Sequence, residues 1–149
     1  MKPPLTPHAT RQLPLAARAA LLWLLLMCVE MLHGTLRTIV LAPRLGDFPA
    51  RQLAVFSGSL LNFAVTYACT PWLAAPTRRA RLLTGALWLV LTLAFELTLG
   101  RFVFGLSWER LAEDFRLWDG GLLPIGMVLL ALSPLLAAGL RARRGERRR

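Results

Sequence analysis

The run from Leu13 to Ala42 is long enough to cross a bilayer, yet three ionisable residues, Glu30, His33 and Arg37, lie deep inside it. On a helix that turns by about 100° per residue, their side chains form a single polar stripe. A charged side chain near the bilayer centre costs about 2.5 to 3.5 kcal/mol on insertion scales, so this stripe is expected to face protein or water. Any function of the chain should therefore be sought here.

Composition and charge place the whole chain in the membrane class. Of its 149 residues 56% are hydrophobic, and the mean hydropathy of +0.52 lies outside the usual range of soluble domains. The net charge of +10 would suggest nucleic-acid binding in a soluble protein. Twelve of the eighteen basic residues, however, fall on one side of a chain that crosses four times: Lys2, Arg11, Arg18, Arg78, Arg79, Arg81, Arg141, Arg143, Arg144, Arg147, Arg148 and Arg149. The positive-inside rule then places both termini in the cytoplasm, and no nucleic-acid partner is expected.

The predicted fold is all-α, with four transmembrane helices in a domain covering residues 15–140. The spans are expected at about 17–42, 52–75, 82–104 and 121–140, divided by proline, glycine and charged residues. Residues 1–14 are rich in proline and are expected to form a flexible basic arm, and 141–149 a basic cytoplasmic tail. Pro43 is expected to end the first span and to open an outer loop.

A short amphipathic helix is predicted on the outer surface, before the fourth span. In this segment Leu111, Phe115 and Trp118 fall on one helical face, and Ser107 can open the helix as its N-cap. Anchoring to the lipid bilayer and docking of a partner are both compatible with such a helix.

The two halves of the chain share a pattern, because Glu30-x-x-x-Gly34 recurs as Glu96-x-x-x-Gly100. This favours two similar helical hairpins related by an axis along the membrane normal, although chance similarity is a rival in a chain dominated by a few residue types. Gly34, Gly58 and Gly100 are expected to allow close helix packing.

Small and polar residues recur every four positions in the second span, at Gly58, Asn62, Thr66 and Thr70. This stripe is the natural surface to face the first helix, where Asn and Thr can hydrogen-bond across the interface. The two threonines can instead bond back to carbonyls of their own helix.

The sequence predicts a polar cluster made of Glu30, His33, Arg37, Asn62, Glu96 and Arg101. Two arrangements of its charges are open. In the first, Glu30 pairs with Arg101 and Glu96 with Arg37. In the second, both arginines reach the outer headgroups, while each glutamate is protonated or bonded to Asn62, Tyr67 or His33.

Known reaction motifs do not occur in the chain. It has two histidines, one of them in the arm, and Cys28 and Cys69 are expected to behave as small apolar residues within the spans. No catalytic residue, metal site or cofactor is therefore predicted.

A structural or accessory membrane protein is the leading hypothesis, with a membrane protein or a second copy as its partner. A small oligomeric proton- or cation-linked transporter that uses Glu30 and Glu96 is the first alternative, and an intramembrane enzyme acting on a lipidic substrate is the second. A structural ion pair should be sealed and permanently paired, whereas a transport site needs an acid that water can reach.

Four segments resemble a group of small bacterial four-helix membrane proteins that has no assigned function. They are residues 41–53, 56–61, 95–101 and 106–110. The resemblance implies the four-helix fold and the bacterial inner membrane, and it implies no activity.

Overall fold

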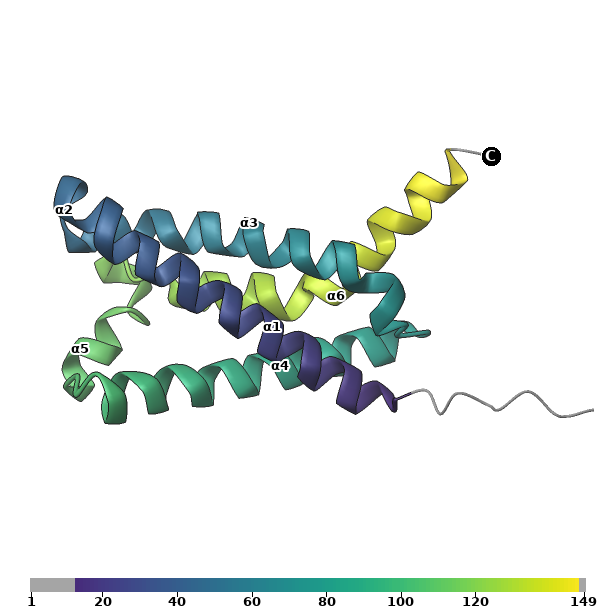
Figure 1. The fold of residues 1–149 in the computed structure, drawn as a ribbon, viewed down its shortest axis with the longest axis horizontal. Helices are drawn as coiled ribbons and strands as arrows, with labels where there is room; N and C mark the ends of the chain where they lie inside the picture. Colours follow the sequence, from purple (N-terminus) through teal and green to yellow (C-terminus); the bar gives the residue numbers. More distant parts are fainter. Residues whose placement is uncertain (1–12, 148–149) are drawn as a thin grey trace, which may run out of the picture.

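The computed structural model describes residues 13–147, in which four long helices are joined by turns and short helical segments and no strand occurs (Figure 1). The long helices are α1 (Leu15–Leu36), α3 (Asp47–Leu73), α4 (Arg78–Thr98) and α6 (Leu123–Glu146). The shorter elements are the π-helical segments η1 (Arg37–Leu41) and η2 (Leu99–Val103), the single turn α2 (Ala42–Leu45), the short helix α5 (Trp108–Glu113) and the 3₁₀ turn η3 (Leu117–Asp119).

The helix α6 lies between α3 and α4 and packs along both of them (Figure 1). In front of this layer, α1 runs diagonally from α4 at one end of the bundle to α3 at the other (Figure 1). The start of α1, the α3–α4 connection and the end of α6 share one end, and α2 and α5 share the opposite one (Figure 1). We call these the arginine end and the α5 end.

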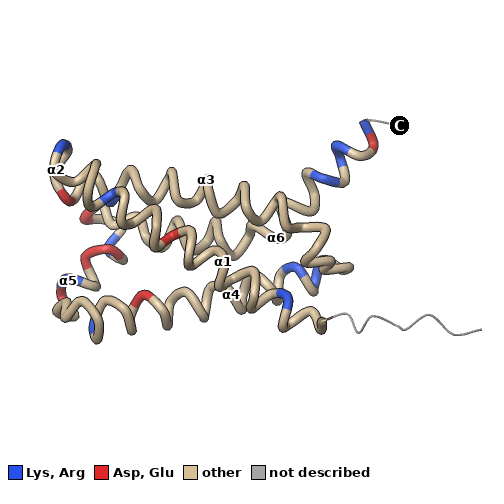
Figure 2. The backbone as a smooth tube through the Cα atoms, viewed as in Figure 1, with Lys and Arg blue, Asp and Glu red and all other residues tan. Residues whose placement is uncertain are grey.

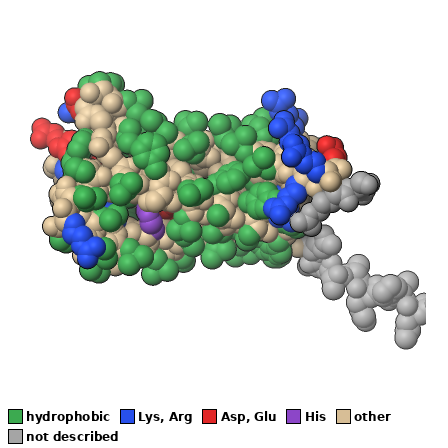
Figure 3. Space-filling model, turned by 90° about the horizontal axis from the view of Figure 1, so that it is seen from above, with side chains coloured by type: hydrophobic (Ala, Val, Ile, Leu, Met, Phe, Trp, Pro, Cys, Tyr) green, Lys and Arg blue, Asp and Glu red, His purple; other side chains and the backbone are tan. Residues whose placement is uncertain are grey.

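Most charged side chains gather at the two ends of the bundle and leave a largely apolar band between them (Figures 2 and 3). The exceptions are Glu30 of α1 and Glu96 of α4, which lie between the two ends. The arginine end holds eight described arginines, at the start of α1, at the start of α4 and at the end of α6: Arg18, Arg78, Arg79, Arg81, Arg141, Arg143, Arg144 and Arg147. All four long helices are long and apolar enough to cross a membrane, with α1 counted through α2 and α4 through η2.

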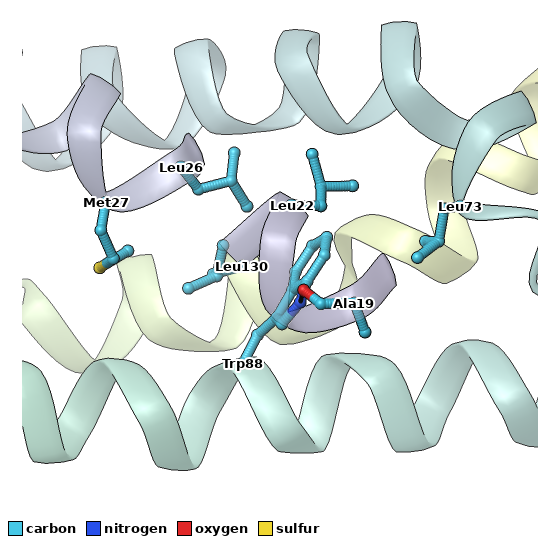
Figure 4. Packing of buried hydrophobic residues seen from close by; sticks show 7 residues of the cluster. All are labelled: Ala19, Leu22, Leu26, Met27, Leu73, Trp88 and Leu130. Carbon is cyan, nitrogen blue, oxygen red and sulfur yellow. Dashed lines mark hydrogen bonds between the residues drawn. The ribbon is translucent and has the colours of Figure 1, made fainter. Parts of the chain in front are cut away.

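Two tryptophans fasten α1 to α4 in the half of the bundle nearer the arginine end. Trp88 of α4 is fully buried and donates a hydrogen bond from its indole N–H to the carbonyl of Ala19, at 2.9 Å (Figure 4). Trp23 of α1 donates to the Thr92 hydroxyl at 3.0 Å and packs edge-to-face on Phe95. Because a buried indole N–H needs a partner, these bonds fix both position and orientation. Leu22, Leu26, Leu73 and Leu130 fill the space around Trp88 (Figure 4).

The first helix does not end at Pro43, and the outer loop expected after it is reduced to Gly46. The helical chain continues to Leu45, and α3 begins at Asp47. Pro43 occupies the first turn of α2, where its missing N–H is tolerated, directly after the π-helical segment η1. Gly46 makes the reversal with φ +86°, a conformation that favours glycine.

The predicted arm and tail are only partly described. Residues 1–12 lie outside the described part of the chain, as do Arg148 and Arg149. In the described portion of the tail, α6 continues as a helix through Arg141, Arg143 and Arg144 to Glu146.

The amphipathic helix is shorter than predicted. Ser107 does cap it, since its hydroxyl accepts a hydrogen bond from the Arg110 N–H at 3.2 Å. The helix ends at Glu113, however, so Trp118 is not on its apolar face and is 83% exposed. Gly100 lets Leu111 approach η2, because a Cβ added at Gly100 would lie 2.5 Å from the Leu111 side chain.

The tightest helix crossing lies at Gly85, which the sequence did not single out. A Cβ added there would lie 1.8 Å from the carbonyl oxygen of Ala131 in α6. Gly34, which was expected to pack helices together, has no neighbouring atom within 4 Å of such a Cβ. Close approach therefore occurs between α4 and α6 and not at Gly34.

We expect Gly85→Ala to lower the free energy of unfolding by about 1 to 3 kcal/mol, because α4 and α6 must move apart. Gly34→Ala is the matched control and should stabilise α1 by about 0.5 to 1 kcal/mol, since alanine is the better helix former. Thermal unfolding of both variants in detergent, followed by circular dichroism, measures the difference. Equal stability of the two variants would contradict the close crossing at Gly85.

Candidate functional site

A cavity of about 550 Å³ occupies the half of the bundle nearer the α5 end, with one face of each long helix in its wall. It exists because α1 leaves α4 as it crosses toward α3. Met27, Thr92 and Leu130 form its floor, and Met27 and Leu130 also belong to the buried core around Trp88. The packed core thus separates the cavity from the arginine end.

Glu30 holds α1 against α3 at this level. Its Oε1 atom accepts a hydrogen bond from the Asn62 side-chain N–H at 2.7 Å. Gly58, one turn earlier on α3, makes room for the carboxylate, because an added Cβ would lie 2.9 Å from Oε1. Gly58 and Asn62 of the predicted stripe therefore face the first helix in the structure, and Gly58 makes room for the side chain of Glu30 and not for a close approach of the two backbones.

Thr66 and Thr70, the other two residues of this stripe, form no hydrogen bond with the first helix. Thr70 donates its hydroxyl hydrogen to the Thr66 carbonyl of its own helix at 2.8 Å, as the alternative interpretation held. The Thr66 hydroxyl is buried and has no partner among the described residues.

His33 extends the polar chain from Glu30 to the surface of α3. Its Nε2 atom lies 2.9 Å from the Ser57 hydroxyl, and its Nδ1 atom lies 3.7 Å from Glu30 Oε2. Because the Ser57 hydroxyl donates to the Leu53 carbonyl, Nε2 is the nitrogen that carries a proton toward Ser57. Nδ1 then faces Glu30 Oε2 at 3.7 Å, beyond hydrogen-bond distance.

Glu96 faces the cavity from α4 without a basic partner. Among residues 13–147 no basic side chain lies within 4 Å of its carboxylate and no hydrogen bond to it is formed. Glu30 and Glu96 therefore line the same cavity, but only Glu30 has a hydrogen-bond partner.

Neither crosswise ion pair considered from the sequence forms in the described part of the chain. Arg37 lines the cavity but pairs with Asp47 at 3.2 Å. Arg101 lies outside the cavity lining, donates to the Leu106 carbonyl at 3.1 Å and stacks over Trp108. Tyr67 does not meet a glutamate either, because Arg141 donates to its carbonyl at 2.9 Å and stacks over its ring.

An ionic network at the α5 end, which sequence reasoning missed, closes the cavity there. Arg51 pairs with Asp47, Glu113 and Asp114, and Arg110 contacts the same three acids. The Asp47–Arg51 and Arg110–Asp114 pairs are four residues apart on their helices, and this spacing could have indicated them. The contacts that join α3 to α5, in contrast, link residues more than sixty positions apart and have no local signal.

The order Ser57–His33–Glu30 matches that of a serine, histidine and acid triad, but α3 does not supply the rest of such a site. Ser57 and its neighbours lie inside a continuous helix from Asp47 to Leu73, where backbone N–H groups bond to carbonyls of the helix. Acyl transfer needs free N–H donors to stabilise the oxyanion. The arrangement is better suited to moving a proton than to forming an acyl-enzyme.

Within the described residues no three His, Cys, Asp or Glu side chains converge as metal ligands do. No family model, no curated protein and no solved structure matches the chain.

The Glu30–Asn62 bond can be tested by a double-mutant cycle with Glu30→Leu, Asn62→Leu and the double variant. Asn62→Leu alone should cost about 1 to 3 kcal/mol of unfolding free energy, because it leaves a carboxyl group without its hydrogen bond. The double variant should recover part of that loss, with a coupling above about 0.5 kcal/mol. Additive losses would show that the two side chains do not interact.

Proposed function

We propose that the protein is a small membrane-embedded carrier that loads and releases a proton or another cation at Glu30 and Glu96. The observation that carries the proposal is Glu96, a carboxylate without a basic partner in the wall of a cavity of about 550 Å³. Ionisable groups within spanning helices line transport paths or find permanent partners. A purely structural role would be better served by the paired arrangement that the cavity lacks.

Insertion in the bacterial inner membrane, with both termini in the cytoplasm, is part of the proposal. The apolar band between two charged ends supports insertion, and the eight described arginines at the arginine end support this orientation (Figures 2 and 3). A fluorescent protein fused to the carboxyl terminus, which matures in the cytoplasm, checks the orientation.

The side chains around Glu30 supply a way for protons to move. His33 connects Glu30 to Ser57, which is exposed on the flank of α3. An imidazole can receive a proton on one nitrogen and release one from the other. Glu30 can therefore exchange protons with the surface, while Glu96 meets the cation in the cavity.

The π-helical segments support a site that changes shape. η1 follows α1 and η2 follows α4, so the two helices that diverge around the cavity both carry one, and Arg37, Ile39 and Leu99 from these segments line it. Such segments often occur at functional sites, because a wider turn weakens regular helix bonding. The two similar hairpins remain part of the proposal as halves of a carrier.

A structural or accessory role is the second candidate, favoured by the surface near α5. Trp108 and Trp118 are 59% and 83% exposed there, as expected of a membrane anchor or of a docking site for a partner. In this role the Glu30–Asn62 bond would fix helix register only.

Proton or cation flux into proteoliposomes tests the carrier. Wild type should conduct, and Glu96→Gln should abolish flux while the protein stays folded, because the amide cannot release a proton. Glu109→Gln is the matched control, since it removes an exposed acid of α5 outside the cavity. Absence of flux in wild type, with earlier thermal unfolding of Glu30→Gln and Glu96→Gln, would support the structural role instead.

A further inference from the structure

The cavity is larger and more apolar than a site for a proton or a bare metal ion needs to be. Its volume of about 550 Å³ falls among the cavities of roughly 300 to 1,000 Å³ that take drug-sized molecules. Three phenylalanines and three methionines lie in its wall: Phe48, Phe95, Phe104, Met27, Met31 and Met127. Aromatic faces attract cations, and methionine side chains adapt to bodies of different shape. The wall therefore fits an organic molecule.

The cavity can be reached from the flank of the bundle. Met31 of α1, Ile39 of η1 and Phe104 at the end of η2 line it and are also exposed on the surface. In a membrane this flank meets lipid, so an apolar molecule can enter from the bilayer.

The hydrogen-bond donors in the wall are already used within the protein. Six side chains of the lining donate to protein groups: Thr35, Arg37, Thr38, Arg51, Gln52 and Asn62. The two arginines among them are paired with carboxylates of Asp47, Glu113 and Asp114. They offer no unpaired positive charge, so the wall does not suit an anion.

Three acceptor groups in the same wall, in contrast, lack a donor from the described residues. They are the carboxylate of Glu96, the Oε2 atom of Glu30 and the Oδ1 atom of Asn62. Asn62 is only 7% exposed, and its Oδ1 atom is unpartnered although its amide N–H donates to Glu30. Buried acceptors are normally satisfied, and here two of the three groups are carboxylates. The wall therefore calls for a cation that carries N–H donors.

We infer that the cavity binds an apolar amine in its ammonium form. The ammonium group pairs with Glu96, the free acceptors of Glu30 and Asn62 lie in the same wall, and the apolar body packs on the phenylalanines and methionines. An inorganic cation would leave the apolar wall unused, and no metal-ligand cluster of His, Cys, Asp and Glu occurs within residues 13–147. This inference rests on the proposed function, because it names the cation that the carrier would load.

Isothermal titration calorimetry of the full chain in detergent tests the inference with 2-phenylethylamine and three matched probes. 2-Phenylethanol lacks the charge, the trimethylammonium derivative has the charge without N–H donors, and methylamine lacks the apolar body. We expect 2-phenylethylamine to bind about tenfold more tightly than each of them, as the loss of a charge-assisted hydrogen bond or of apolar contact predicts. Equal affinity for 2-phenylethanol or the trimethylammonium derivative would overturn the inference, as would displacement by an equal concentration of sodium ions.

Two pairs of variants assign the binding to this cavity. Glu96→Gln should weaken the binding of 2-phenylethylamine by about tenfold, whereas Glu109→Gln, which changes an exposed acid outside the cavity, should not. Gly34 lies in the wall with no atom within 4 Å of an added Cβ. Gly34→Phe should therefore fill part of the cavity and weaken binding while both carboxylates remain, and Gly34→Ala should bind as wild type does. Circular dichroism establishes that the variants are folded, and unchanged affinity in folded Glu96→Gln or Gly34→Phe would contradict the site.

The flux measurement separates this inference from the carrier. Flux that depends on Glu96, in a protein that does not bind 2-phenylethylamine, overturns the amine and leaves a carrier of protons or inorganic cations. Amine binding that depends on Glu96, in a protein without flux, overturns the carrier and leaves an amine-binding site.

Discussion

The hydrogen bond from Asn62 to Glu30 sets the position of α1, and the cavity depends on that position. A carboxylate in an apolar bundle has to find partners in the protein, and α3 provides them through Asn62, with Gly58 making room for the side chain. At the other end, α1 is held to α4 by the indole N–H of Trp88. Because α1 is bonded to α3 at one end and to α4 at the other, it must cross from one helix to the other. The space that this crossing opens is the cavity that contains Glu96.

The main features of the fold follow from local pattern. Long apolar runs require helices when backbone groups must be satisfied internally, so four long helices could be predicted from hydropathy alone. The stripe of Gly58 and Asn62 pointed to the first helix because polar residues at intervals of four share one face and seek each other in an apolar setting. Of the six residues of the predicted polar cluster, Glu30, His33, Arg37, Asn62 and Glu96 line one cavity, and Arg101 does not.

The remaining features depend on which neighbour each helix face meets, and periodicity does not contain that information. The predicted positions of Arg37 and Arg101 along the spans allowed ion pairs with the two glutamates. In the folded chain, however, Arg37 pairs with Asp47, and Arg101 donates to the Leu106 carbonyl. Trp23 and Trp88 are ordinary apolar residues in the sequence, and only their partners on the facing helix give them a role. Pro43 shows a third case, because a preceding π-helical segment allows a helix to continue where proline usually ends it.

The central claim is that Glu96 is a reactive carboxylate in a cavity that a ligand can reach. Infrared difference spectroscopy of the membrane-reconstituted protein between two pH values measures this directly. The account predicts a carboxyl band that changes with pH and is missing from the same difference spectrum of Glu96→Gln. A spectrum in which no band assigned to Glu96 responds to the change of pH would contradict the account, because it would show a sealed side chain.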